Sequence, residues 1–104
     1  MKPEDIKRCL DRVKFTSHAK EEMLGESFGG ILEQEVFQAM MSGEIIEAYE
    51  TDRPLRSYLV YGRTKKGRHL HVVCAPVLEE NTLVIITVYE PDPKRWVDFR
   101  RRIK

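Results

Sequence analysis

The sequence has few of the features that define the common catalytic and metal-binding proteins. Cys9 and Cys74 are its two cysteines, and since they lie far apart and form no CxxC pair, they predict neither a zinc ribbon nor a disulfide framework. The chain contains no glycine-rich phosphate loop, no nucleophile elbow and no HExxH sequence. These absences exclude the nucleotide-binding proteins, hydrolases and zinc proteases that such motifs define.

Long apolar runs and a secretory leader are also missing. No apolar stretch approaches the roughly 20 residues that span a bilayer. The N-terminal residues become charged and amphipathic at once, so no signal-peptide core is present. We therefore expect no membrane partner, and we expect the reducing cytoplasm as the location.

Charges are separated along the chain, although the formal net charge is only +1. Residues 21–52 contain nine acidic residues and no lysine or arginine. Residues 53–78 contain six basic residues and no acidic residue. The C-terminal segment adds further basic residues, namely Lys94, Arg95, Arg100, Arg101, Arg102 and Lys104. The basic half favours a polyanion partner, although a solvated charged face would give the same pattern.

The length of 104 residues and the hydrophobic fraction of 41% indicate a single domain over residues 1–104 with one modest core. Apolar residues at helical spacing predict helices over residues 2–12, 18–25 and 32–42. A brief extended link over residues 13–16 and a loop over residues 27–30 are expected between them.

The second half of the chain reads as a sheet followed by a helix. Period-two patterns predict strands over residues 44–49, 57–64, 69–75 and 83–89, joined by hairpins. Asp92 and Pro93 predict the start of a C-terminal helix that buries Trp96, Phe99 and Ile103. We expect an α+β fold: N-terminal helices, a four-stranded antiparallel meander sheet and a C-terminal helix.

Alternation along the last two strands divides their side chains between two faces. The face expected to lie under the helices carries Leu70, Val72, Cys74, Val84, Ile86 and Val88. The opposite face carries His69, His71, Val73, Leu83, Ile85, Thr87 and Tyr89, so His71, Thr87 and Tyr89 are expected to share a side. Tyr61 and Arg63 share one face of an earlier strand. A rigid sheet that carries several proton-moving groups is a suitable floor for a site.

Several short motifs occur in a fixed order: Ser17-His18-Ala19, residues 36–43, Leu59-Val60-Tyr61-Gly62, His71-Val72-Val73, and Ile86-Thr87-Val88-Tyr89 with Trp96. Together they resemble the bacterial family described as domain of unknown function 4258 (DUF4258), over residues 13–101. That family is similar in layout to the BrnT toxins and, more distantly, to the RelE-type ribonuclease toxins. Those are small α+β domains whose sheet face cuts RNA without a metal and which a partner antitoxin holds in check.

The resemblance implies a RelE/BrnT-like ribonuclease-toxin architecture and a toxin-like endoribonuclease with an RNA substrate and an antitoxin partner. It implies no cofactor. His71 would serve as base or acid, because histidine titrates near neutrality. Arg63 would steady the charged phosphorane through its planar fork. Tyr89 would donate a proton or stack on a base. His18 would position a phosphate or cap its helix. The expected RNA-binding residues are Tyr61, Thr87, Arg68, Lys65 and Lys66.

The same residues have structural readings. His71 could be satisfied within the sheet by a nearby backbone group or by Thr87, and Trp96 and Phe99 could serve the core. His69 and His71 could together chelate a metal, but no third ligand lies at a suitable spacing, so no metal is expected. The alternative function is a non-catalytic protein-interaction module, including self-association, in which the acidic and basic halves make protein contacts.

Overall fold

The computed structural model describes residues 3–26 and 29–103. Three parts of the predictions lie outside the described residues: Lys2 at the start of the first predicted helix, residues 27–28 of the predicted loop, and Lys104 of the predicted basic helix.

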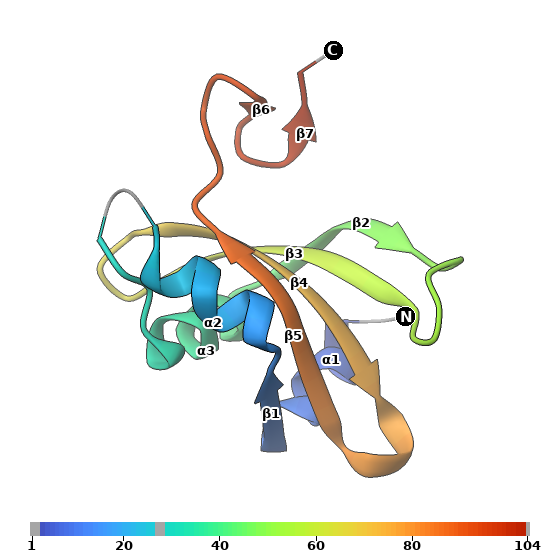
Figure 1. Ribbon diagram of the computed structural model, residues 1–104. Coiled ribbons are helices and arrows are strands. Elements are labelled where there is room, and N and C mark those ends of the chain that lie inside the picture. The colour runs from blue at the N-terminus through green and yellow to red at the C-terminus, as the bar shows by residue number, and fades with distance from the viewer. Residues whose placement is uncertain (1–2, 27–28, 104) are drawn as a thin grey trace.

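A mixed sheet forms the centre of the described part of the chain (Figure 1). Its strands are β1 (Arg12–Phe15), β2 (Glu44–Tyr49), β3 (Ser57–Arg63), β4 (His69–Val77) and β5 (Thr82–Tyr89), in the order β1-β5-β4-β3-β2. Strands β2 to β5 pair antiparallel with their neighbours in sequence, whereas β1 pairs parallel with β5. Valine, isoleucine and aromatic residues, which fit a pleated and half-buried surface, fill β3, β4 and β5.

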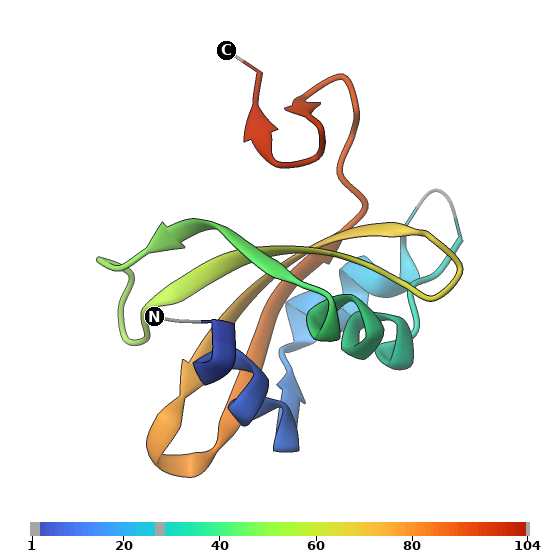
Figure 2. The ribbon, with the colours of Figure 1, turned by 180° about the vertical axis from the view of Figure 1, so that it is seen from behind.

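The helices lie on one face of this sheet, as Figures 1 and 2 show from opposite sides. They are α1 (Pro3–Arg8), α2 (Ser17–Leu24) and α3 (Glu33–Met41), with the 3-10 turns η1 (Cys9–Asp11) and η2 (Leu78–Glu80). Thr16 fixes the start of α2, since its hydroxyl oxygen accepts from the N–H of Ala19 at 3.1 Å. The same hydroxyl donates to the carbonyl of Ile86 at 3.2 Å, so one side chain caps α2 and ties it to β5.

The main core lies between these helices and the sheet. Leu70, Val72 and Cys74 of β4 are fully buried there, on the face that the alternation predicts. Fully burying a large aliphatic side chain contributes about 1.5–3 kcal/mol to stability. Helix α3 lies so close to β3 that a Cβ atom on Gly62 would stand 1.9 Å from the carbonyl oxygen of Ala39. Glycine is therefore required at position 62, and α3 packs directly against this face of the sheet.

The predicted four-stranded antiparallel meander is wrong, because residues 12–15 form a fifth strand, parallel to β5. We expected only an extended link over residues 13–16. The pairing of β1 with β5 joins segments that lie 70 residues apart, so no local pattern reveals it. The alternating burial along β1 is nevertheless that of a short strand.

The predicted C-terminal helix is also wrong. Residues 92–103, which we call the C-terminal arm, form a turn at Asp92 and then a hairpin of β6 (Trp96–Val97) and β7 (Arg101–Arg102). Figure 1 shows this hairpin above the sheet, on the side away from the helices. The run from Trp96 to Phe99 consists of weak helix formers, and Phe99 has a left-handed φ of 62°. Ile103, predicted as buried, is 51% exposed. The predicted RelE/BrnT-like architecture therefore fails both in its sheet and at its C-terminus.

On β5, the predicted inward face is wrong over the first half of the strand. Leu83 and Ile85 are fully buried, whereas Val84 and Ile86 are only partly buried. A β-bulge in the pairing with β4 shifts the register by one residue, and the alternation reverses there. Val88, beyond the bulge, is buried as predicted.

The contact at Gly62 gives a test of the fold. Gly62→Ala should lower the free energy of unfolding by about 1–3 kcal/mol, because the new Cβ atom must displace the backbone of α3. Urea unfolding followed by circular dichroism measures this. Gly25→Ala is the matched control, since a Cβ there meets its nearest atom, the Glu21 carbonyl oxygen, at 3.4 Å. Equal stability of the Gly62 variant and the wild type would contradict the packing described.

Candidate functional site

The sheet face opposite the helices, which we call the outer face, carries most of the predicted site residues. His71 on β4 pairs with Tyr61 of β3 on one side and with Tyr89 of β5 on the other. Arg63 pairs with His69. Arg63 lies two residues from Tyr61 on β3, and His69 lies two residues from His71 on β4, so both are on the same face as the Tyr61–His71 pair. Thr87 lies there too, opposite Val73. The expectation that His71, Thr87 and Tyr89 share a face is confirmed by this register, which also places Tyr61 and Arg63 beside them.

His71 occupies the centre of the outer face and is 0% exposed. Its Nε2–H donates to the carbonyl oxygen of Phe99 at 2.6 Å. Its Nδ1 accepts from the hydroxyl of Tyr89 at 3.0 Å. The ring of Trp96 stands edge-on to the imidazole, with the ring centroids 4.4 Å apart. Both ring nitrogens are therefore bonded, and the carbonyl partner fixes the proton on Nε2.

The surroundings set the protonation states of this pair. Burial lowers the pKa of His71, and the Phe99 carbonyl and the charge of Glu47 oppose this only in part. Burial raises the pKa of Tyr89 to about 12. At neutral pH the imidazole is thus neutral and the phenol protonated, which gives a matched acceptor and donor that share one hydrogen bond.

Tyr61 and His69 form a second feature of the outer face, a flat surface that we call the platform. Their rings are nearly parallel, with an interplanar angle of 12° and centroids 5.8 Å apart. A hydrogen bond of 2.6 Å joins the Tyr61 hydroxyl to Nδ1 of His69. Burial and the neighbouring Arg63 lower the pKa of His69, which favours its neutral form. The platform is therefore aromatic and uncharged at neutral pH.

The C-terminal arm covers both features. The ring of Phe99 lies parallel to His69, with centroids 3.9 Å apart, and the guanidinium carbon of Arg100 lies 4.7 Å from the ring centroid of Tyr61. The guanidinium of Arg102 lies in the same way over Trp96, at 4.8 Å. The closed arm thus keeps solvent away from His71 and from most of the platform.

Ion pairs with the edge strand β2 hold the arm in place. Arg100 pairs with Glu44, and both side chains are about half exposed. Arg102 pairs with Glu47 at 2.8 Å, and Glu47 also accepts from the hydroxyl of Tyr49. The bond to Arg102 holds the pKa of the Glu47 carboxyl below its usual value. Exposed pairs of this kind contribute roughly 0.2–1 kcal/mol each, so the arm is held by several weak contacts.

The remaining predicted residues do not join His71. His18 lies on α2, in the helix layer, where it is 65% exposed and pairs with Glu22 at 3.3 Å. Lys65 and Lys66 lie in the turn between β3 and β4. Arg68 is occupied within the protein, since its guanidinium pairs with Glu90 and Glu35 and bonds the carbonyl of Gly30. It ties the β3–β4 turn to the segment before α3.

A cleft of about 540 Å³ opens where β5 meets the arm, beside Tyr89. Its lining is of mixed charge: it combines the aromatic Tyr89 and Trp96 and the apolar Ile103 with basic and acidic side chains, namely Lys94, Arg95, Arg102, Glu90 and Asp92. Among the described residues, no group of three or more histidine, cysteine or acidic side chains could hold a metal ion. His69 and His71 are instead bonded to Tyr61 and Tyr89.

Sequence reasoning missed the part that the arm and β2 play in this site. Helical spacing predicts that Trp96 and Phe99 lie on the buried side of a helix, and the strand pattern gives Glu44 and Glu47 no role. The available signal was Arg100 and Arg102, two residues apart, which is strand spacing, and the acidic β2 as their counterpart.

Comparison with known protein families gives a match. The profile of the family described as domain of unknown function (DUF4258) matches residues 15–90, which extend from the end of β1 to the end of β5 and stop before the arm. No curated protein and no solved structure matches the chain. Within residues 3–26 and 29–103, no helix has both the length and the apolar character needed to cross a membrane.

The buried neutral His71 makes stability depend on pH. Because its pKa is lower in the folded than in the unfolded protein, its contribution is complete above the unfolded value of about 6.5 and is lost as the pH falls further. We expect the free energy of unfolding to fall between pH 7 and pH 5, and His71→Gln to remove part of that fall. Urea unfolding at both pH values measures it, and equal pH dependence in the two proteins would show that His71 does not contribute.

Proposed function

The chain belongs to the family described as domain of unknown function (DUF4258), and on that premise we propose that it is a toxin-like domain that binds and cleaves RNA on its outer face without a metal. The observation that carries the proposal is the hydrogen-bonded pair of His71 and Tyr89, at 3.0 Å, with Arg63 on the same face. An imidazole and a phenol that share a hydrogen bond can pass protons in both directions.

RNA cleavage by the neighbouring 2′-hydroxyl needs a base, an acid and a cation. Once the arm has left, proton exchange with water converts His71 from the tautomer with its proton on Nε2 to the one with its proton on Nδ1. Nε2 is then free to take the 2′-hydroxyl proton. The Nδ1 proton then passes to Tyr89, while the Tyr89 hydroxyl gives its own proton to the leaving 5′-oxygen. The 2′-oxygen–phosphorus bond forms, the 5′-oxygen–phosphorus bond breaks, and Arg63 steadies the charge on the phosphorane. The pair ends in its resting state, with the proton on Nε2.

The arm has to leave His71 for this reaction, because the imidazole is 0% exposed and Nε2 is bonded to the Phe99 carbonyl. The closed form is therefore the resting state in this proposal. A protein antitoxin in the cytoplasm that keeps the arm closed, or that covers Arg63, would hold the domain inactive.

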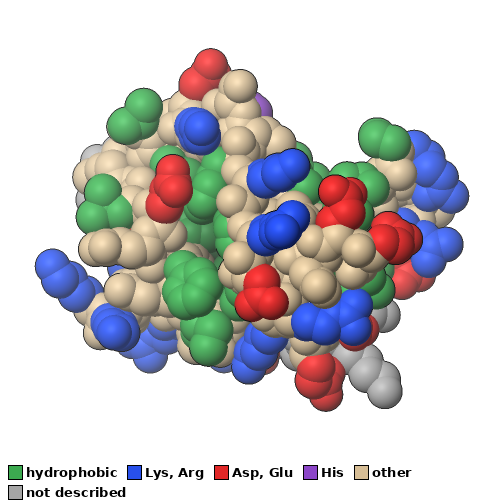
Figure 3. Space-filling view, turned by 90° about the horizontal axis from the view of Figure 1, so that it is seen from below, with side chains coloured by type: hydrophobic (Ala, Val, Ile, Leu, Met, Phe, Trp, Pro, Cys, Tyr) green, Lys and Arg blue, Asp and Glu red, His purple; other side chains and the backbone are tan. Residues whose placement is uncertain are grey.

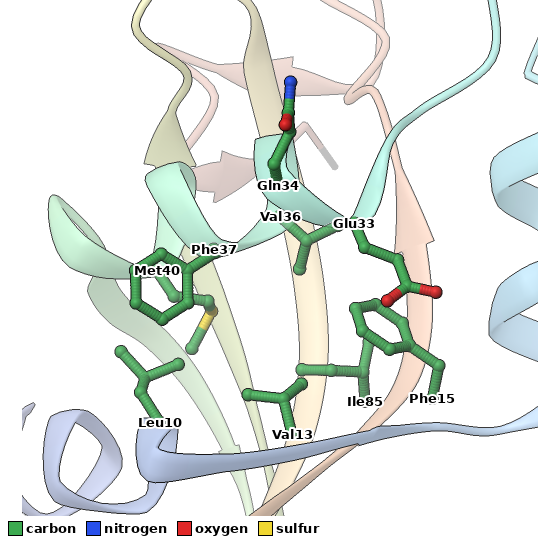
Figure 4. A pocket seen from close by; sticks show the side chains of 9 residues that line it. All are labelled: Leu10, Val13, Phe15, Glu33, Gln34, Val36, Phe37, Met40 and Ile85. Carbon is green, nitrogen blue, oxygen red and sulfur yellow. The ribbon is translucent and has the colours of Figure 1, made fainter.

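A second candidate, a protein-interaction module, is favoured by a groove on the helix side. The groove has a volume of about 250 Å³ and is lined mainly by apolar side chains of η1, β1, α3 and β5. Figure 3 shows apolar side chains around a hollow on this face, and Figure 4 shows Val36, Phe37 and Met40 opposite Leu10 and Val13. Phe37 is 46% exposed, so an apolar surface is left open to a partner.

An RNA cleavage assay tests the first proposal. Wild-type protein should release fragments that end in 2′,3′-cyclic phosphate, and His71→Ala should slow this by about 10²- to 10⁴-fold, the usual contribution of a general base. His18→Ala is the matched control and should keep the wild-type rate, since His18 lies in the helix layer. Cleavage that persists unchanged in the His71 variant, or that depends on a divalent metal, counts against the proposal.

Sedimentation velocity tests the second candidate through self-association at the groove. If the groove binds a second copy, the wild type should sediment faster as its concentration rises, and Phe37→Glu should abolish this because it places a charge in the apolar contact. Leu24→Glu is the control, at a position 83% exposed and outside the groove. A wild type that stays monomeric at every concentration rules out self-association by this surface.

A further inference from the structure

We propose that the platform of Tyr61 and His69 is a stacking site for a nucleobase of single-stranded RNA, and that Phe99 and Arg100 of the closed arm fill this site when RNA is absent. The inference rests on the proposed function for the nature of the ligand. The inference adds two points to cleavage at His71: how the RNA is held and how the arm opens.

The platform has the shape that base stacking requires. Tyr61 and His69 lie on adjacent strands: Tyr61 pairs with His71, and His69 lies two residues before His71 on β4. Their rings are inclined by 12°, and the 2.6 Å hydrogen bond between them holds them edge to edge. Two antiparallel strands fix both Cα positions, so the flat surface is present before any ligand binds. Aromatic rings on a sheet are a recurring support for unpaired bases.

The present occupants resemble such a ligand in shape. Phe99 stacks on His69 at 3.9 Å with an angle of 12°, and it is also parallel to Tyr61, at 6.0 Å and 11°. Arg100 covers the remaining ring, with its guanidinium carbon 4.7 Å from the Tyr61 centroid. A planar phenyl ring and a planar guanidinium thus lie on the platform where a nucleobase would lie.

The occupants are held in a way that favours exchange. Asp98 and Phe99 have φ angles of 53° and 62°, both left-handed, in a turn closed by a 3.0 Å bond from the Arg100 N–H to the Val97 carbonyl. Turns of this kind favour asparagine and glycine, so Phe99 is placed there at a conformational cost. The ion pair of Arg100 with Glu44 is half exposed and screened by salt. Lifting Phe99 separates this half-exposed ion pair and breaks one buried hydrogen bond, the one from His71 Nε2 to the Phe99 carbonyl oxygen.

The charge around the platform selects the ligand class. Arg63 lies beside His69, and Lys65 and Lys66 follow in the turn at the end of β3. An opened arm adds Arg100 and the arginines of β7, which the closed form pairs in part with acidic β2. An aromatic surface can stack unpaired bases, and a row of cations beside it can bind a phosphate backbone. Single-stranded RNA has both groups.

The test measures the binding of a fluorescent 2′-O-methyl RNA octamer, which lacks the reacting hydroxyl and so cannot be cleaved. Fluorescence anisotropy gives Kd for the full-length wild type and for Phe99→Ala. We expect Phe99→Ala to bind about 5- to 150-fold more tightly, the range of one stacked base, because the ring no longer competes for the platform. Val97→Ala is the control within the arm and should leave Kd unchanged.

Two further measurements separate stacking from charge. Tyr61→Leu in the Phe99→Ala background should return Kd to the wild-type value or weaker. An abasic oligonucleotide of equal length and charge should show no gain with Phe99→Ala, which keeps the test independent of whether the Tyr61 variant folds. An unchanged Kd in Phe99→Ala, or an equal gain with the abasic strand, overturns the stacking site. Loss of the His71-dependent cleavage of ordinary RNA alone would remove the reaction and leave the stacking site in place.

Discussion

The close approach of α3 to β3 is the constraint on which the arrangement of the site depends. With the Ala39 carbonyl lying where a Cβ atom of Gly62 would stand, the helix layer is committed to one face of the sheet. Side chains alternate between the two faces of a strand, and Tyr61 is next to Gly62 on β3, so Tyr61 lies on the other face. His71 and Tyr89 lie on that face too, because His71 pairs with Tyr61 and Tyr89 pairs with His71. One backbone contact thus separates the part of the sheet that stabilises the fold from the part that is available for chemistry.

His71 shows how a buried polar group that satisfies the fold can also suit the proposed chemistry. Its two hydrogen bonds, to Phe99 and Tyr89, satisfy the ring completely, which is what a structural histidine needs. Of these two bonds, the one to Tyr89 lies within the sheet, whereas the one to Phe99 depends on the arm. Lifting the arm therefore leaves a positioned imidazole–phenol pair with one nitrogen free. A histidine enclosed wholly by the sheet would not gain this accessibility.

The sequence predicts the elements of this fold better than their assembly. Strands β2 to β5 and the shared face of His71 and Tyr89 follow from local periodicity. The parallel pairing of β1 does not, because its partner is distant in the chain and its pattern is only four residues long. Trp96 and Phe99 also fit helical spacing, so the sequence predicts a helix where the arm forms a hairpin. Its hairpin depends on contacts with β2 and β4, which no local pattern contains.

The charge segregation in the sequence has a structural explanation in the arm. The chain is nearly neutral overall, at +1, and this would argue against a nucleic-acid ligand if the charges were mixed. In the closed form, however, Arg100 and Arg102 are paired with Glu44 and Glu47 on the edge strand. Opening the arm moves cations away from these carboxylates. Under the proposed function, RNA would be repelled by β2 and attracted by the arm, so the polyanion itself would favour the open form. The acidic edge balances the charge of the arm in the closed form.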